Sequence, residues 1–322
     1  MRGISQLWKN LEELNAEAIL RTADENELPA LLELWTAVLN PDVSVFTSMY
    51  ASVPGVKRTT FVVECDGKIV SSVQLFILPI RDELCKAVPV GAIANVSTLP
   101  EYRSRGFAKK LLAMAYDDMK AAGCAWSFLF TGIMPFYEKL GWRQIHRTFL
   151  GVNIGTKADT DSHSDVILQD PPDLERLHML SESSFVSALT QIRGDLDWKH
   201  KIPPRMGGKL VFMGEDSFAI VQTGGGKVTI EEWGMPEPSV IKFRYLIDAV
   251  AHWAVENDIH RLIVSAPIVA EARQVLETCF SHVDEIDVAD AMVRPVSGKW
   301  PMTRLVSLFS LPEARFLGLD SF

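Results

Sequence analysis

The chain has 322 residues, which fits two domains of ordinary size better than one. A hydrophobic content of 48% and a charged content of 23% are typical of a globular protein, and no apolar run approaches the roughly 20 residues of a membrane-spanning helix. The net charge of -9 disfavours a nucleic-acid-binding surface, because phosphate neutralisation needs clustered lysines and arginines, and it is compatible with a cationic small substrate.

The first elements in the chain predict a helix, a strand and a second helix. Leu7, Leu11 and Leu14 share one helical face, but charged residues interrupt it, so we expect a short surface helix and no signal peptide. Residues 18–22 have the pattern of a strand. Asp24 is placed to cap the helix that follows it, whose apolar residues repeat with helical spacing.

Alternating strands and helices continue to about residue 153. A strand hairpin is predicted around the tight-turn pair Asp66-Gly67, and the next strand covers residues 88–96. A helix from residue 107 that ends at Gly123, a strand at 125–130, a short helix at 135–140 and a strand at 142–152 complete the unit. This order predicts an α/β (α+β) domain.

The second half repeats this order after a polar stretch. Residues 154–165 are rich in Asp, Ser and Thr without apolar periodicity, which indicates a linker. Strands are predicted at 209–213, 217–222, 227–233 and 261–265, and helices at 239–255 and 270–280. We therefore predict a first domain at 1–153, a linker at 154–167 and a degenerate copy of the first domain at 168–322, each a mixed, mostly antiparallel sheet flanked by helices.

Cysteine and histidine spacing gives no support for a metal or a disulfide framework. The four cysteines occur without a Cys-x-x-Cys pair, and the seven histidines include no His-Glu-x-x-His. We expect a reducing cytoplasm, no catalytic metal, and no binding to membranes or nucleic acid.

The strongest chemical signal is the segment Arg103-Ser104-Arg105-Gly106-Phe107-Ala108 between a predicted buried strand and a helix. A turn at this place can present successive backbone N–H groups at a helix N-terminus, where the peptide dipoles favour a pyrophosphate. Glycine allows close approach of the backbone, and the two arginines add positive charge. Alone, such a string also fits a solvated basic helix start.

The surrounding motifs resemble the GCN5-related N-acetyltransferase (GNAT) superfamily over about residues 18–152. The turn follows Val96-Ser97-Thr98-Leu99-Pro100, and Phe136-Tyr137-Glu138-Lys139-Leu140-Gly141-Trp142 comes about 30 residues later, as the family pattern requires. The resemblance implies that acetyl-CoA is a co-substrate. Its pantetheine arm would pair with the backbone of Val96, Ser97 and Thr98, and its pyrophosphate would lie on a second set of residues, namely Arg103, Ser104, Arg105, Gly106, Phe107, Ala108 and Lys109.

The resemblance also implies that Tyr137 protonates the departing coenzyme A thiolate, although a packing role beside Phe136 is the alternative. The strand that often carries a glutamate base in relatives has Ala92, Ala94 and Asn95 here, so the base cannot be read from it.

The expected function is acetyl transfer to a primary amine of a small molecule or peptide, and a homo-oligomer is left open. The second copy lacks the phosphate turn, since Glu237 lies between two prolines there, and would shape the acceptor cleft. A non-catalytic acyl-CoA sensor is the alternative.

The tandem arrangement resembles the enhanced-intracellular-survival acetyltransferases and the mycothiol synthases. In the former, a terminal phenylalanine carboxylate serves as the base, which would assign that role to Phe322. A mobile or merely packed tail is the alternative.

Overall fold

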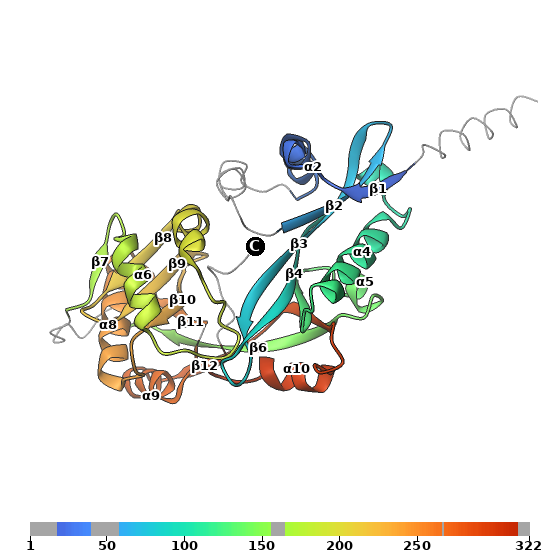
Figure 1. Cartoon of the computed structure of the whole chain (residues 1–322). Helices are drawn as coiled ribbons and strands as arrows, with labels where there is room; N and C mark the ends of the chain where they lie inside the picture. Colours follow the sequence, from blue (N-terminus) through green and yellow to red (C-terminus); the bar gives the residue numbers. More distant parts are fainter. Residues whose placement is uncertain (1–17, 40–57, 156–164, 266, 315–322) are drawn as a thin grey trace, which may run out of the picture.

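The computed structural model describes residues 18–39, 58–155, 165–265 and 267–314 (Figure 1). The helix expected around residues 7–14 and the proposed base Phe322 lie outside the described residues, so both stay predictions. Figure 1 shows two lobes joined along two long strands, β6 and β12.

The elements of the first half agree with the predicted order. Asp66 and Gly67 have positive φ values of 52° and 75°, as the tight turn between β2 and β3 requires. The elements are β1 (Ile19–Thr22), the short helix η1 (Glu25–Glu27), α2 (Leu28–Leu39), β2 (Arg58–Cys65), β3 (Lys68–Arg81), β4 (Ala87–Thr98), η2 (Pro100–Tyr102), α4 (Phe107–Ala121), β5 (Trp126–Phe130), α5 (Met134–Glu138) and β6 (Arg143–Asn153).

The second half contains every predicted element and several that the sequence pattern did not indicate. The elements are β7 (Ile167–Gln169), α6 (Leu174–Ser183), η3 (Asp197–Lys201), α7 (Ile202–Arg205), β8 (Lys209–Met213), β9 (Phe218–Gly224), β10 (Lys227–Gly234), α8 (Val240–Glu256), β11 (Arg261–Val264), α9 (Ala270–Cys279), β12 (Val283–Pro295) and α10 (Met302–Phe309). The unpredicted elements are β7, α6, η3, α7, β12 and α10.

All strands of the described chain form one sheet in the order β1-β2-β3-β4-β5-β12-β6-β11-β10-β9-β8-β7. The halves exchange strands at its centre. β12, from the second half, pairs with β5, whereas β6, from the first half, pairs with β11, and the two exchanged strands pair with each other. The expected mixed and mostly antiparallel architecture is confirmed, with parallel pairing only at β4–β5 and β10–β11.

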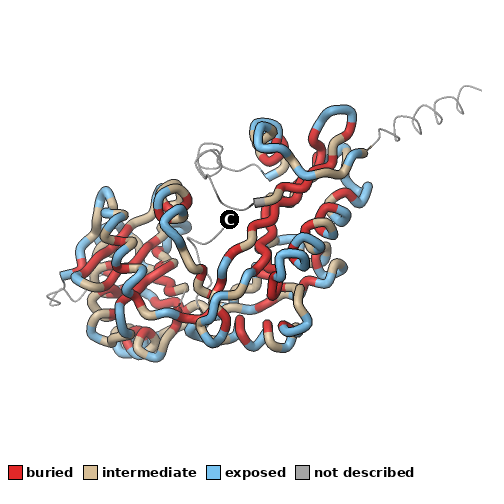
Figure 2. The backbone as a smooth tube through the Cα atoms, viewed as in Figure 1, coloured by how far each residue is buried: buried red, intermediate tan, exposed pale blue. Residues whose placement is uncertain are grey.

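Two large cores form on the two sides of the exchanged strands, with a smaller cluster beside the second (Figure 2). Because of the strand exchange, Met292, Trp300 and Leu308 pack in the core of the first half, whereas Leu150 and Val152 pack in the core of the second half. Trp300 lies against Trp126 with ring centroids 4.6 Å apart. Each core therefore contains residues from both halves of the chain.

A segment at residues 184–193 straps the halves together. The Phe185 N–H donates to the Met235 carbonyl in the second half, and the Leu189 N–H donates to the Arg81 carbonyl at the end of β3. The segment returns to the second half, where Arg193 makes a bidentate ion pair with Glu232, both distances being 2.8 Å. The two side chains are only 7% and 1% exposed.

We expect Glu232→Gln to destabilise the protein by about 3–5 kcal/mol, because it leaves a buried guanidinium without its countercharge. Asp216→Asn is the matched control: it breaks the Lys242–Asp216 pair, whose side chains are 41% and 42% exposed, and it should cost at most about 1 kcal/mol. Urea unfolding followed by fluorescence measures both. Equal losses in the two variants would contradict the structural importance of the buried pair.

Candidate active site

The sheet of the first half splits between β4 and β5. These strands pair only at Gly91–Ser127 and Ala92–Phe128. Beyond this point β4 continues to pair with β3 as far as Thr98, while the next partner of β5 is β12 on its other side. The edge of β4 that faces β5 therefore has no strand partner beyond Ala92 among the described residues. An extended ligand can add to such an edge.

A β-bulge lies on this open part of β4. The register with β3 shifts between the Gln74–Ala94 and Ser72–Ser97 pairs, and Asn95 has a φ of 49°. Val96 is half-buried and Ser97 is 1% exposed. The Ser97 hydroxyl has no hydrogen-bond partner within the described part of the chain. A buried hydroxyl without a partner in the protein is available to hydrogen-bond a ligand.

The turn after β4 leads into α4 with unusual backbone angles. Ser104 and Gly106 have φ values of 64° and 77°, and Gly106 is the N-cap residue of α4 without a side-chain cap. The side chains of Arg103, Ser104 and Arg105 are exposed, as is Lys109. The N-terminal amides of α4 therefore face an open, positively charged surface.

The turn before α4 is anchored to the core by its inward-facing side chains, while its outer surface is exposed to solvent. Phe107 is buried in the core, and Ala108 is half-buried. The Arg103 Nε donates to the Thr98 carbonyl at 3.1 Å, and the Arg105 guanidinium lies 4.9 Å from the Tyr102 ring centroid.

The space in front of Gly106 is suitable for a pyrophosphate. A Cβ built on Gly106 would meet no atom within 4 Å. Open space, uncapped N–H groups and two neighbouring arginines are the features that bind phosphates at helix N-termini. The segment predicted from the sequence therefore fits the diphosphate of a nucleotide coenzyme.

Tyr137 lies on α5, and its side chain is 7% exposed. Its ring makes edge contacts with Phe136 at 4.9 Å and Trp142 at 6.1 Å between centroids. No residue of the described chain accepts a hydrogen bond from its hydroxyl. Burial raises the pKa of Tyr137 to about 12, so the phenol keeps its proton at neutral pH.

Arg294, on the exchanged strand β12, connects α4 with the segment around Tyr137. Its guanidinium lies 3.6 Å from the Tyr116 ring centroid on α4 and 4.8 Å from that of Trp142. Trp142 in turn contacts Tyr137. The second half thus supplies a side chain that helps to position α5 relative to α4. The sequence does not reveal this role of Arg294, because no local pattern indicates a strand exchange.

No carboxylate base appears on β4. Ala92 and Ala94 are buried, and the Asn95 Nδ2 donates to the Gln74 Oε1 at 2.8 Å. Gln74 in turn donates to the Thr60 hydroxyl at 3.1 Å. Within the described ranges, no cluster of three or more His, Cys, Asp or Glu residues could hold a metal ion.

The corresponding opening of the second half is filled. Beyond the last β10–β11 pair, Ile230–Val264, the buried Trp233 donates to the Pro267 carbonyl at 3.1 Å. A Cβ on Gly234 would lie 2.3 Å from the Ser184 hydroxyl. The strap and the indole therefore occupy the place where the first half is open.

We expect one coenzyme per chain for this reason. Calorimetric titration of the protein with acetyl-CoA should give a stoichiometry of one, with all binding lost when the first-half turn is blocked. A stoichiometry of two would mean that Trp233 moves aside and that the second half also binds the coenzyme.

Comparison with known proteins agrees with this geometry. The sequence matches the family described as acetyltransferase (GNAT) domain over residues 20–145. No curated protein matches the chain in a sequence search. None of the described helices is long and apolar enough to cross a membrane.

Solved structures with similar folds cover most of the chain. A probable N-acyltransferase of unknown function from Enterococcus faecalis V583 has a TM-score of 0.66 and 12% identity, covering 87% of this chain and 72% of its own. Eis1 from Mycobacterium abscessus has a TM-score of 0.63 and 12% identity, with coverages of 86% and 74%.

A tandem GNAT protein from the clavulanic acid biosynthesis pathway has a TM-score of 0.54 and 11% identity, and covers 87% of this chain and 99% of its own. At these identities the structural matches establish the fold. Together with the domain match over residues 20–145, they agree with the resemblance that the motifs indicated: the first half matches the GNAT acetyltransferase domain, and the chain has the fold of tandem two-domain GNAT proteins.

Proposed function

We propose that the protein transfers an acetyl group from acetyl-CoA directly to a primary amine. The observation that carries this proposal is the combination of an open, uncapped α4 N-terminus with a split sheet and a buried tyrosine side chain whose hydroxyl has no hydrogen-bond partner among the described residues. Each feature suits a different part of the same co-substrate: the pyrophosphate, the pantetheine arm and the thiol.

The residues of the turn would bind and orient the co-substrate. Backbone amides from Ser104 to Lys109 would bind the pyrophosphate, with Arg103 and Arg105 neutralising part of its charge. The free edge of β4 at residues 96–98 would pair with the amide groups of the pantetheine arm. Binding along two fixed elements holds the thioester in one place, which lowers the entropic part of the barrier.

The reaction requires two proton transfers. The amine nitrogen forms a bond to the acetyl carbon, the carbon–sulfur bond breaks, the nitrogen loses a proton and the sulfur gains one. Tyr137 would donate the proton to sulfur; its raised pKa keeps it protonated before the transfer, and the tyrosinate left behind regains a proton from solvent once the coenzyme A thiol has been released. The proton from nitrogen goes to a base that β4 does not supply.

A second candidate, an acyl-CoA-binding sensor without turnover, is favoured by one observation. The described part of β4 offers Ala92, Ala94 and Asn95 where a base would act. The available Tyr137 hydroxyl favours the enzyme. Binding of acetyl-CoA without product formation from any amine would support the sensor.

The discriminating experiment incubates the protein with acetyl-CoA and a panel of polyamines, aminoglycosides, amino acids and peptides. Free thiol is followed by a colorimetric assay and acetylated product by mass spectrometry. The proposal expects stoichiometric thiol and N-acetyl product with at least one amine. Saturable coenzyme binding with no acetylated product from any amine of the panel would contradict the acetyltransferase proposal and support the acyl-CoA-binding sensor.

The proposed compartment is the cytoplasm. The four cysteines all lie within the described residues and are free thiols, which suits a reducing environment. We propose no nucleic-acid partner and no membrane partner, in line with the net charge of -9 and the absence of a long apolar run.

A further inference from the structure

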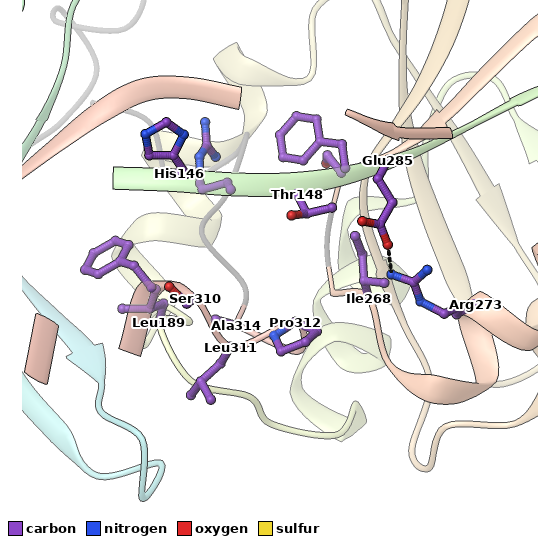
Figure 3. A pocket seen from close by; sticks show the side chains of 14 residues that line it. His146, Thr148, Leu189, Ile268, Arg273, Glu285, Ser310, Leu311, Pro312 and Ala314 are labelled. Carbon is purple, nitrogen blue, oxygen red and sulfur yellow. Dashed lines mark hydrogen bonds and ion pairs between the residues drawn. The ribbon is translucent and has the colours of Figure 1, made fainter. Parts of the chain in front are cut away.

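A cavity of about 370 Å³ lies between the two halves along β6 (Figure 3). This volume falls in the usual range of ligand sites, about 300–1,000 Å³. Its walls come from β6, from the segment after β11, from α9 and β12, and from the residues that follow α10. No residue expected to bind the coenzyme lines it.

One end of the cavity lies close to the split in the first-half sheet. The Arg147 guanidinium is 5.5 Å from the ring centroid of Phe130, the last residue of β5, and it donates to Asp290 at 2.6 Å. The Asp290 carbonyl accepts from the Thr131 N–H, directly after β5. Since β12 alone separates β5 from β6, this end is about 10 Å from the open edge of β5.

The other end carries a guanidinium with unused donors. Arg273, on α9, donates through one nitrogen to Glu285 at 2.8 Å and approaches Glu277 at 3.8 Å. Its side chain is 37% exposed. A guanidinium has five N–H donors, so most of those on Arg273 remain available within the described structure. Figure 3 shows this pair at one end of the cavity and His146 at the other.

The polar groups of the walls suit a carboxylate on an otherwise uncharged chain. The wall contains the guanidinium groups of Arg147 and Arg273, and Glu285 is its one acidic residue among the described residues. Arg147 is already paired with Asp290, so Arg273, with donors left beyond Glu285, is the guanidinium available to a carboxylate. Thr148 projects from β6 toward Leu311 and Pro312 (Figure 3), and its hydroxyl makes no hydrogen bond to another described residue. It is available to a ligand amide.

We infer that the cavity binds the carboxylate-bearing part of the acceptor, and that the acceptor is an extended, peptide-like amine. Only one part of this inference, that the ligand carries the reacting amine, rests on the proposed function. Along β6, residues His146 to Phe149 span about 10 Å. Across the sheet, at most about 10 Å separates β6 from the open edge of β5. A chain of about four residues, roughly 13 Å long, reaches from the cavity toward that edge.

Tetra-alanine as the free acid and tetra-alanine amide are the matched probes, because they differ only in the terminal charge. Their binding is measured by calorimetry on the full chain without coenzyme. A charge-assisted hydrogen bond to Arg273 predicts that the acid binds about 10- to 100-fold more tightly than the amide. In Arg273→Gln this preference should disappear.

Arg304→Gln is the control variant. Arg304, on α10, pairs with Glu83 at 2.7 Å with similar exposure, 35%, but it does not line the cavity. This variant should keep the preference for the acid. No binding of the acid, equal binding of acid and amide to the wild type, or an equal loss in both variants overturns the carboxylate site.

Acetylation of the same two peptides separates this inference from the proposed function. If the acid and the amide bind equally and both are acetylated, the proposed acetyltransferase activity is supported and the carboxylate site is contradicted. If the acid is preferred through Arg273 but neither these peptides nor any amine of the panel is acetylated, the site stands and the proposed reaction fails.

Discussion

Tyr137→Phe is expected to lower kcat by about 10²- to 10⁴-fold while the Kd for acetyl-CoA stays unchanged. The hydroxyl acts when the thiolate departs, so its loss affects the transition state rather than coenzyme binding. The ring remains, and with it the contacts to Phe136 and Trp142. Steady-state kinetics with a good amine and calorimetry with acetyl-CoA measure the two quantities.

Tyr116→Phe is the matched control. The Tyr116 hydroxyl donates to the Pro295 carbonyl at 2.9 Å, so its role is structural, and removing it should cost about 1 kcal/mol of stability with kcat near the wild-type value. If both variants keep near-normal turnover, Tyr137 is a packing residue. If both lose turnover equally, the general-acid role has no support.

The pH dependence of kcat follows from the direction of the Tyr137 shift. Burial raises its pKa to about 12, above the ordinary value near 10, so the proton-donating form persists through the alkaline range. The wild-type profile should therefore show no decline from Tyr137 below about pH 11. A decline near pH 10 that Tyr137→Phe removes would mean that the hydroxyl is solvated in the working enzyme.

Gly106→Trp is expected to weaken acetyl-CoA binding at least about 100-fold, a loss of about 2.8 kcal/mol. A Cβ at this position meets no atom within 4 Å, and the indole attached to it would extend into the space assigned to the pyrophosphate. Calorimetry on the folded variant gives the result.

Gly123→Trp separates this effect from backbone strain. Gly123 lies just beyond the other end of α4, has a φ of 70°, and also has open space around its Cβ position. A non-glycine residue at such a φ costs about 1–2 kcal/mol, so both variants lose similar stability. Gly123→Trp should bind acetyl-CoA normally. Normal binding by Gly106→Trp as well would remove the turn from the coenzyme site.

The turn and the hairpin could be predicted from sequence because their signals are local. Asp66 and Gly67 form the tight turn that this pair of residues predicts, and both have positive φ values. Gly106 directly precedes α4 with a φ of 77°, which glycine adopts without strain. The α/β order of the first half followed from apolar periodicity, which is also a short-range property.

The strand exchange could not be predicted in the same way. β12 contains apolar and acidic residues in a pattern that fits either half, and only the three-dimensional pairing with β5 places Arg294 beside Trp142. The filled opening around Trp233 is likewise a tertiary feature, since Pro267 and Ser184 come from distant segments. The sequence did indicate the missing phosphate turn there, through Glu237 and its flanking prolines.

The two adjacent glutamates of β10 illustrate what a strand pattern does establish. Neighbouring residues on a strand point to opposite faces, so at most one of the two can face a cleft. Glu231 pairs with Lys209, and Glu232 with the buried Arg193 of the strap. The strand pattern predicts that the two carboxylates lie on different faces. Their partners, Lys209 and Arg193, could be identified only from the three-dimensional structure.

A crystal structure of the protein with bound acetyl-CoA would show where the coenzyme lies. We predict one coenzyme per chain, with its pyrophosphate on the backbone amides from Ser104 to Lys109, its pantetheine arm along residues 96–98 and its sulfur within hydrogen-bond reach of the Tyr137 hydroxyl. A coenzyme bound beside Trp233 in the second half, or one whose sulfur lies far from Tyr137, would contradict this prediction.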